Sequence, residues 1–161
     1  MSNVCVVIPT YNERENLPLL AEKIFALKIP GMRLFVVDDN SPDGTGDAAD
    51  ELARQFPITV IHREKKEGLG KAYVDAFRKI LSEEKCDYIV QMDADLSHDP
   101  KVIPAMLKHV ETHDIVVGSR YVNGGKIMHW HFLRRMLSRF GNLYARTILG
   151  LPYRDVTSGF K

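Results

Sequence analysis

Short apolar runs alternate with amphipathic segments along most of this chain, and this alternation limits the folds open to it. Five runs are short, apolar and rich in β-branched residues, as strands are; they lie at residues 4–8, 34–37, 58–61, 88–92 and 115–117. Between and after them, apolar residues recur at helical spacing over residues 17–25, 48–56, 69–82 and 100–112. Strands that alternate with helices predict an α/β fold, with a mostly parallel sheet and helices on both of its faces.

The length and composition suit one globular domain. The chain has 161 residues, of which 45% are hydrophobic and 27% charged, and this length corresponds to about one domain. Its longest apolar runs are far shorter than the roughly 20 residues of a membrane-spanning helix, and the start Met1-Ser2-Asn3 lacks the basic region of a secretory signal. Cys5 and Cys86 are too few for a disulfide framework. We therefore expect a reduced protein in the cytoplasm.

Charge is distributed unevenly along the chain. Residues 1–119 carry 14 Lys and Arg against 20 Asp and Glu, whereas residues 120–161 carry 8 against a single Asp. In the basic part, apolar side chains recur at helical spacing at Phe132, Leu133, Met136, Leu137, Phe140, Tyr144 and Ile148. Four arginines interrupt this stripe, and Trp130 precedes it.

A basic amphipathic helix with an aromatic anchor is typical of a protein that binds the surface of an anionic bilayer. An ordinary packed helix with a solvated basic face is the alternative interpretation. Binding to nucleic acid is not expected, because the aromatic residues of the stretch are not interleaved with its basic ones for base stacking and the isoelectric point of 7.8 is low for such a protein.

Polar segments follow three of the predicted strands, at residues 9–13, 38–44 and 93–98. Ligands of such sheets bind outside the carboxyl ends of the strands. Asp93 and Asp95 lie two apart after an apolar strand, where they would repel each other without a nearby positive charge. Carboxylates together with substrate phosphates commonly hold Mg²⁺ or Mn²⁺. The pair therefore predicts a metal and diphosphate site, with a simple turn as the alternative.

Two further readings of these segments stay open. A carboxylate of the Asp38-Asp39 pair can accept hydrogen bonds from a base or a ribose hydroxyl, although helix capping is possible here, with Asp43 and Thr45 as better candidates. Residues 93–97 also approximate the DxDx(T/V) motif of haloacid-dehalogenase-type phosphatases, with Asp93 as nucleophile. That motif usually lies on the first strand of a chain, and residue 97 is a serine.

Taken in order, these segments resemble the family 2 glycosyltransferases of GT-A fold, a Rossmann-like nucleotide-sugar-binding fold. More narrowly, they are similar to the dolichol-phosphate (polyprenol-phosphate) mannose synthases. The resemblance covers essentially the whole chain. It runs through residues 7–17 (VIPTYNERENL), 37–45 (VDDNSPDGT), 68–72 (GLGKA), 92–98 (MDADLSH), 118–121 (GSRY) and 155–160 (DVTSGF).

The resemblance implies roles for individual residues. Those that would surround the guanosine of GDP-mannose are Pro9, Tyr11, Glu13, Val37 and Asp39. Those that would hold the metal and the diphosphate are Asp93, Ala94 and Asp95, with Asp95 as a direct ligand of Mg²⁺ or Mn²⁺. Arg120 would face a phosphate of the donor or the acceptor and, with Asp95, would be catalytic.

The resemblance also implies a function. The enzyme would move mannose from GDP-mannose to a polyprenyl (dolichyl) phosphate with inversion, as a peripheral protein on the cytoplasmic face of a membrane. Residues 1–119 would bind the nucleotide sugar, and residues 120–161 would face the acceptor and the membrane. Because catalytic domains of this family continue beyond the Thr-Ser-Gly-Phe motif, we expect an incomplete domain. The alternatives are a fragment that binds nucleotide sugar without turnover, and a related transferase that uses another sugar, such as UDP-glucose.

Overall fold

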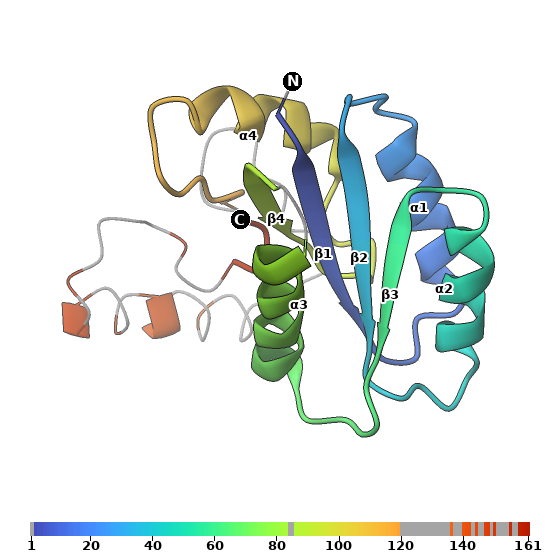
Figure 1. The fold of residues 1–161 in the computed structure, drawn as a ribbon. Coiled ribbons are helices and arrows are strands. Elements are labelled where there is room, and N and C mark those ends of the chain that lie inside the picture. Colours follow the sequence, from blue (N-terminus) through green and yellow to red (C-terminus); the bar gives the residue numbers. More distant parts are fainter. Residues whose placement is uncertain are drawn as a thin grey trace.

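In the part of the chain that the structure describes, four parallel strands form a central sheet (Figure 1). The computed structural model describes residues 2–83, 86–119, 136, 140–142, 144, 147–148, 150, 155 and 158–161. The strands are β1 (Val4–Thr10), β2 (Met32–Asp38), β3 (Ile58–His62) and β4 (Tyr88–Gln91). Their order in the sheet is β3-β2-β1-β4, so β1 is flanked by β2 and β4. Four of the five predicted strands and the parallel sheet are thereby confirmed.

Helices cover both faces of this sheet, as the alternating pattern predicted. They are α1 (Asn16–Phe25), α2 (Thr45–Ala53), α3 (Leu69–Glu83) and α4 (Ile103–His109), the last preceded by the short 3₁₀ helix η1 (Pro100–Val102). Successive side chains of a strand point to opposite faces. On one face, the even-numbered residues 4, 6 and 8 of β1 pack with α1, α2 and α4. On the other, Cys5 and Val7 pack with α3.

Two elements predicted between residues 100 and 117 differ from the structure. The helix predicted over 100–112 is divided and shorter, because Pro100 and Pro104 lack the N–H that a continuous helix needs in its interior, and Asp99 caps a separate first turn through the N–H of Lys101. The strand predicted at 115–117 was wrong: these residues belong to no strand.

The place beside the end of β4 is occupied by a distant part of the chain. Gln91 and Lys161 exchange both backbone hydrogen bonds, and the N–H of Gly118 donates to the carbonyl of Phe160 at 2.9 Å. Residues 158–161 thus lie between β4 and residue 118. Among the described helices, none is long and apolar enough to cross a membrane.

Candidate functional site

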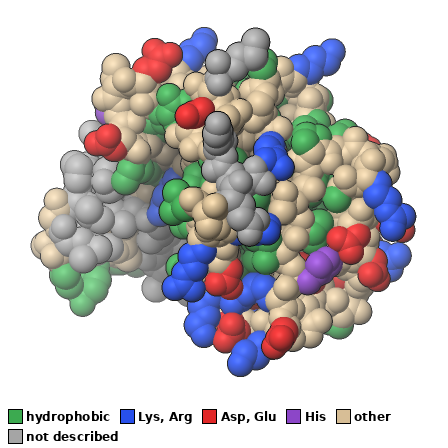
Figure 2. All heavy atoms as spheres, in the orientation of Figure 1, with side chains coloured by type: hydrophobic (Ala, Val, Ile, Leu, Met, Phe, Trp, Pro, Cys, Tyr) green, Lys and Arg blue, Asp and Glu red, His purple; other side chains and the backbone are tan. Residues whose placement is uncertain are grey.

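The carboxyl ends of the four strands lie at one edge of the sheet, the lower edge in Figure 1. The chain runs from β1 outward to β2 and β3, then returns to the other side of β1 to form β4. The strand order therefore reverses between β1 and β4, and such a switch point is where open α/β sheets bind ligands. Figure 2 shows acidic and basic side chains gathered together along this edge.

The loops after β1 and β2 are joined by a short hydrogen-bond network. The backbone N–H of Glu13 donates to the buried hydroxyl of Thr45 at 2.9 Å, and that hydroxyl donates to Asp43 at 2.6 Å. Asp43 also accepts from the N–H of Arg14 and from the N–H of Thr45, the first residue of α2. The Thr45 hydroxyl lowers the pKa of Asp43 below its ordinary value. Glu13 is thereby held beside the start of α2.

Asp38 and Asp39 have different partners. Asp38 accepts hydrogen bonds from the Ser41 N–H at 3.0 Å and from the Thr10 hydroxyl at 3.2 Å, so it shapes the turn after β2. The carboxylate of Asp39 pairs instead with the guanidinium of Arg63. Asp39 is therefore the member of the pair held at the ligand edge by a charged side chain.

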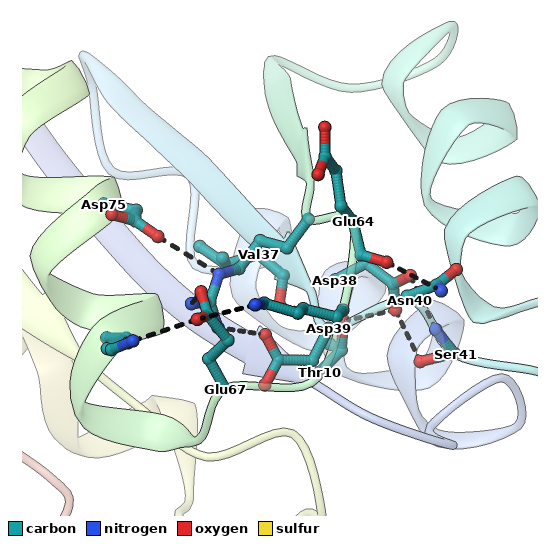
Figure 3. Close-up of polar contacts among 12 residues, drawn as sticks. Thr10, Val37, Asp38, Asp39, Asn40, Ser41, Glu64, Glu67 and Asp75 are labelled. Atoms are coloured by element: carbon teal, nitrogen blue, oxygen red, sulfur yellow. Dashed lines mark hydrogen bonds and ion pairs between the residues drawn. The ribbon is translucent and has the colours of Figure 1, made fainter.

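Arg63 joins three carboxylates at this edge. Its Nη1, Nη2 and Nε atoms contact Asp39, Glu67 and Asp75 respectively, the last two at 3.1 Å. Figure 3 shows these three carboxylates directed toward one another from the end of β2, the loop before α3 and α3 itself. The Arg63 side chain is only 6% exposed, so it offsets their charge away from bulk water.

Arg63 was not among the predicted site residues, although ligands of such sheets bind where the strands end. Arg63 directly follows β3, a fourth strand end at the same edge. Arg63 pairs with Asp39, which precedes it by 24 residues. The spacing of residues along the chain does not reveal such a contact between two separate loops.

The loop that contains Arg63 also reaches Tyr11. The ammonium of Lys66 lies 3.5 Å from the centroid of the Tyr11 ring, a cation–π geometry. Tyr11 and Asp39, both predicted to bind the nucleoside, are thus brought to one loop, residues 63–68. Pro9 ends up half-buried within β1, and the side chain of Val37 is fully buried under α3.

Asp93, Ala94 and Asp95 follow β4. Ala94 is buried, whereas Asp95 is exposed and accepts a hydrogen bond from the Ser97 N–H at 3.0 Å. Leu96, which lies between Asp95 and Ser97, has a φ of +60°. Such a value is unusual for a residue other than glycine. Backbone strain of this kind is concentrated at functional loops.

Two other residues surround the first of these carboxylates. His98 accepts a hydrogen bond from the N–H of Asp93 at 3.1 Å, and its ring stacks on Phe160, with 5.1 Å between centroids. A Cβ added at Gly159 would lie 2.9 Å from a carboxylate oxygen of Asp93. The end of the described chain therefore packs against the Asp93 carboxylate, and a side chain at residue 159 would force that carboxylate to move.

The residues present fit a hard divalent cation that is shared with a phosphate ligand. Asp93 and Asp95 supply carboxylate oxygens, which Mg²⁺ and Mn²⁺ prefer. Among the described residues, no group of three His, Cys, Asp or Glu side chains could enclose a metal by itself. Two carboxylates at a loop edge match a cation that completes its coordination with substrate oxygens and water.

Arg120 lies outside the described residues, as do Trp130 and the four arginines of the predicted membrane-binding stripe. Four apolar members of that stripe are described, and all four are exposed; they are Met136, Phe140, Tyr144 and Ile148. Their spacing of four residues would place them on one side of a helix.

Comparison with curated proteins finds close relatives. The chain is 48% identical over 159 residues to an undecaprenyl-phosphate mannosyltransferase of Micrococcus luteus, covering 98% of the chain and 65% of the relative. It is 45% identical to a polyprenol monophosphomannose synthase of Mycolicibacterium smegmatis, covering 97% and 59%. It is 43% identical to a dolichol-phosphate mannosyltransferase of Pyrococcus furiosus, covering 98% and 45%. The chain thus spans roughly half to two thirds of the length of these relatives.

Solved structures share the fold. A glucosyl-3-phosphoglycerate synthase from Mycobacterium tuberculosis superposes with a TM-score of 0.65 at 22% identity, covering 99% of this chain and 56% of that one. A mannosyltransferase from Pyrobaculum calidifontis, solved with GDP-Man and Mn²⁺, gives a TM-score of 0.52 at 28% identity, covering 58% and 27%. These neighbours and the parallel sheet confirm the predicted Rossmann-like GT-A fold.

The family-level comparison covers nearly every residue of the chain. The model of glycosyl transferase family 2 matches residues 5–160, a range that includes all four strand ends and the Asp93–Asp95 segment. This chain belongs to glycosyl transferase family 2.

Proposed function

We propose that this chain transfers mannose from GDP-mannose to a polyprenyl phosphate, with inversion at the anomeric carbon. The observation that carries the proposal is its 43–48% identity, over 97–98% of its residues, to three proteins named as mannosyltransferases or mannose synthases of polyprenyl phosphates. The geometry of the strand-end loops supports it, since the Asp39 and Asp93–Asp95 segments flank β1 at the same edge.

The nucleoside half of the proposed site lies at the ends of β1 and β2. Asp39, held by Arg63, accepts hydrogen bonds from the nucleoside, and Tyr11 offers an aromatic ring beside it. Glu13 and Pro9 complete the surroundings of the guanosine, whereas Val37, whose side chain is buried under α3, supports the site from within the core. The hydrogen bond from the Glu13 N–H to the Thr45 hydroxyl holds the loop after β1 in position.

The diphosphate half lies at the end of β4. Asp93 and Asp95 hold Mg²⁺ or Mn²⁺, which when bound stabilises the negative charge of the departing nucleoside diphosphate. The Pyrobaculum calidifontis mannosyltransferase solved with GDP-Man and Mn²⁺ supports this pairing of nucleotide sugar and metal. Arg120 contributes a guanidinium that binds a phosphate through two N–H donors.

The acceptor needs no protein base. A phosphate monoester has a second pKa of about 6, so at neutral pH it is largely a dianion. Its oxygen attacks the anomeric carbon of mannose as the bond from that carbon to the diphosphate breaks, and the electron pair leaves with GDP. Attack opposite the leaving group inverts the centre and gives a β-linked mannosyl phosphate.

The acceptor is a lipid, so we propose that the chain works at a membrane surface. The exposed side chains of Met136, Phe140, Tyr144 and Ile148 support this, together with the excess of basic residues after residue 119. Apolar side chains flanked by Lys and Arg bind anionic bilayers by combining burial with charge attraction.

Transfer of radiolabelled mannose from GDP-mannose to a short-chain polyprenyl phosphate tests the function. We expect activity that depends on Mn²⁺ or Mg²⁺, and Asp95→Asn to lower it at least a hundredfold while the thermal unfolding midpoint changes little. The exposed Asp95 carboxylate contributes little to packing. Asp99→Asn, which changes another exposed carboxylate of the same segment, is the matched control.

Two outcomes contradict the proposal. Donor binding without any transfer would show that the chain binds nucleotide sugar but does not turn it over. Faster transfer from UDP-glucose than from GDP-mannose would show that the sugar assignment is wrong.

A further inference from the structure

Helix α3 has three sides with different neighbours, and its residue spacing separates them. The side buried against the sheet carries Ala72, Ala76 and Ile80. At 100° per residue, residues 71, 75 and 78 lie on one flank of that side, where Asp75 contacts Arg63. Tyr73 and Phe77 lie on the opposite flank, and their rings are 5.9 Å apart.

The flank with Tyr73 and Phe77 faces β4. Phe77 lines a cavity of about 580 Å³ together with Tyr88, Ile89 and Gln91 of β4. Tyr73 precedes Phe77 by one turn, so it lies nearer the start of α3, which is at the edge where the strands end. β4 runs into Asp93 at that edge. Helix α3 therefore borders both halves of the proposed site: one flank reaches Asp39 through Arg63, and the other faces β4, the strand that leads to Asp93.

The hydroxyl of Tyr73 is buried and has no hydrogen-bond partner within the part of the chain that the structure describes. Buried hydroxyl groups are nearly always hydrogen-bonded, because leaving one unpaired is costly. Burial and the negative charge of Asp93 raise the pKa of Tyr73 above its ordinary value. A phenol is protonated at neutral pH, so this group offers a neutral O–H donor on the flank of α3 that faces β4.

We propose that Tyr73 binds the nucleotide-sugar donor, its hydroxyl donating a hydrogen bond to a diphosphate oxygen or to a mannose hydroxyl. This inference rests on the proposed function and adds a donor-binding residue from α3. A ligand at the Asp93–Asp95 edge supplies the acceptor oxygen that the described residues do not offer to this hydroxyl.

The variant Tyr73→Phe tests this because it removes only the hydroxyl. Without ligand, we expect the variant to unfold at the same temperature as the wild type or higher, since an unpaired buried polar group is lost. With Mn²⁺ present, isothermal titration should show GDP-mannose binding about tenfold weaker or more. The control Tyr88→Phe, at the opposite end of β4, should leave that affinity unchanged.

Titration with GDP separates the two sources of the acceptor oxygen. If GDP and GDP-mannose lose affinity by the same factor, the partner is a diphosphate oxygen; if only GDP-mannose does, it is a hydroxyl of the sugar. Either result supports the inference. Unchanged affinity for both ligands overturns it, whether or not the unfolding temperature falls.

The wild type distinguishes failure of this inference from failure of the proposed function. If wild-type chain binds no nucleotide sugar, the proposed function and the inference both fail. If it prefers a different nucleotide sugar, only the proposed donor is wrong, and the comparison of Tyr73→Phe with wild type in that ligand still decides the inference.

Discussion

At the scale of single residues, Arg63 determines how Asp39 is presented at the nucleoside site. Its guanidinium contacts three carboxylates through three different nitrogen atoms. A lysine carries the same charge but has no planar fork, so it cannot reproduce this arrangement. Arg63→Lys should leave the fold intact and weaken GDP binding about tenfold, or about 1.4 kcal/mol.

A double-mutant cycle checks whether this effect acts through Asp39. Asp39→Ala alone should weaken GDP binding even without metal, and adding Arg63→Lys to it should weaken binding little further. Arg78→Gln is the matched control, because Arg78 approaches the same Asp75 at 3.9 Å but is largely exposed. Additive losses in the double variant would mean that Arg63 acts independently of Asp39.

At the scale of elements, Asp43 joins the start of α2 to the loop after β1. It accepts hydrogen bonds from Thr45 and from the N–H of Arg14, and Thr45 in turn accepts from Glu13. Asp43→Asn removes the negative charge beside the start of α2, which near a helix N-terminus contributes about 0.3–1 kcal/mol, and it puts an amide NH₂ where Oδ2 accepts from the N–H of Arg14. Asp43→Asn should therefore lower the thermal midpoint by several degrees near neutral pH.

The effect of Asp43→Asn depends on pH in a defined direction. Because the pKa of Asp43 is lowered in the folded chain, the stability it contributes is present above the ordinary carboxyl pKa and is lost as pH falls through the lowered value. The difference between wild type and variant should thus be largest near pH 6 and shrink below pH 4. Asp47→Asn, an exposed carboxylate in the first turn of α2, should show a much smaller difference at every pH.

At the scale of the whole molecule, the pattern of apolar residues predicted the layers and the edge that holds the site. Buried strands such as β1 need continuous apolar runs, and helices need an apolar stripe, so both leave a signal in the sequence. The same signal failed at residues 115–117, because an apolar run does not specify its partner, and Lys161 pairs with β4 instead. Arg63 and the proposed role of Tyr73 could not be predicted, because each depends on how segments distant in the sequence lie in the fold.

The uneven distribution of charge along the chain bears on whether the protein binds a membrane surface. The excess of basic residues after residue 119 and the exposed apolar side chains of Met136, Phe140, Tyr144 and Ile148 predict binding to vesicles. Sedimentation with vesicles should show binding that rises with the fraction of anionic lipid and falls with salt, since exposed charges are screened over about 10 Å at 0.1 M. Replacing Arg134, Arg135 and Arg139 together by Gln should remove most of it, while the control Arg54→Gln in the acidic part should not. Binding that is absent, or that salt leaves unchanged, would instead indicate that this stripe packs against protein.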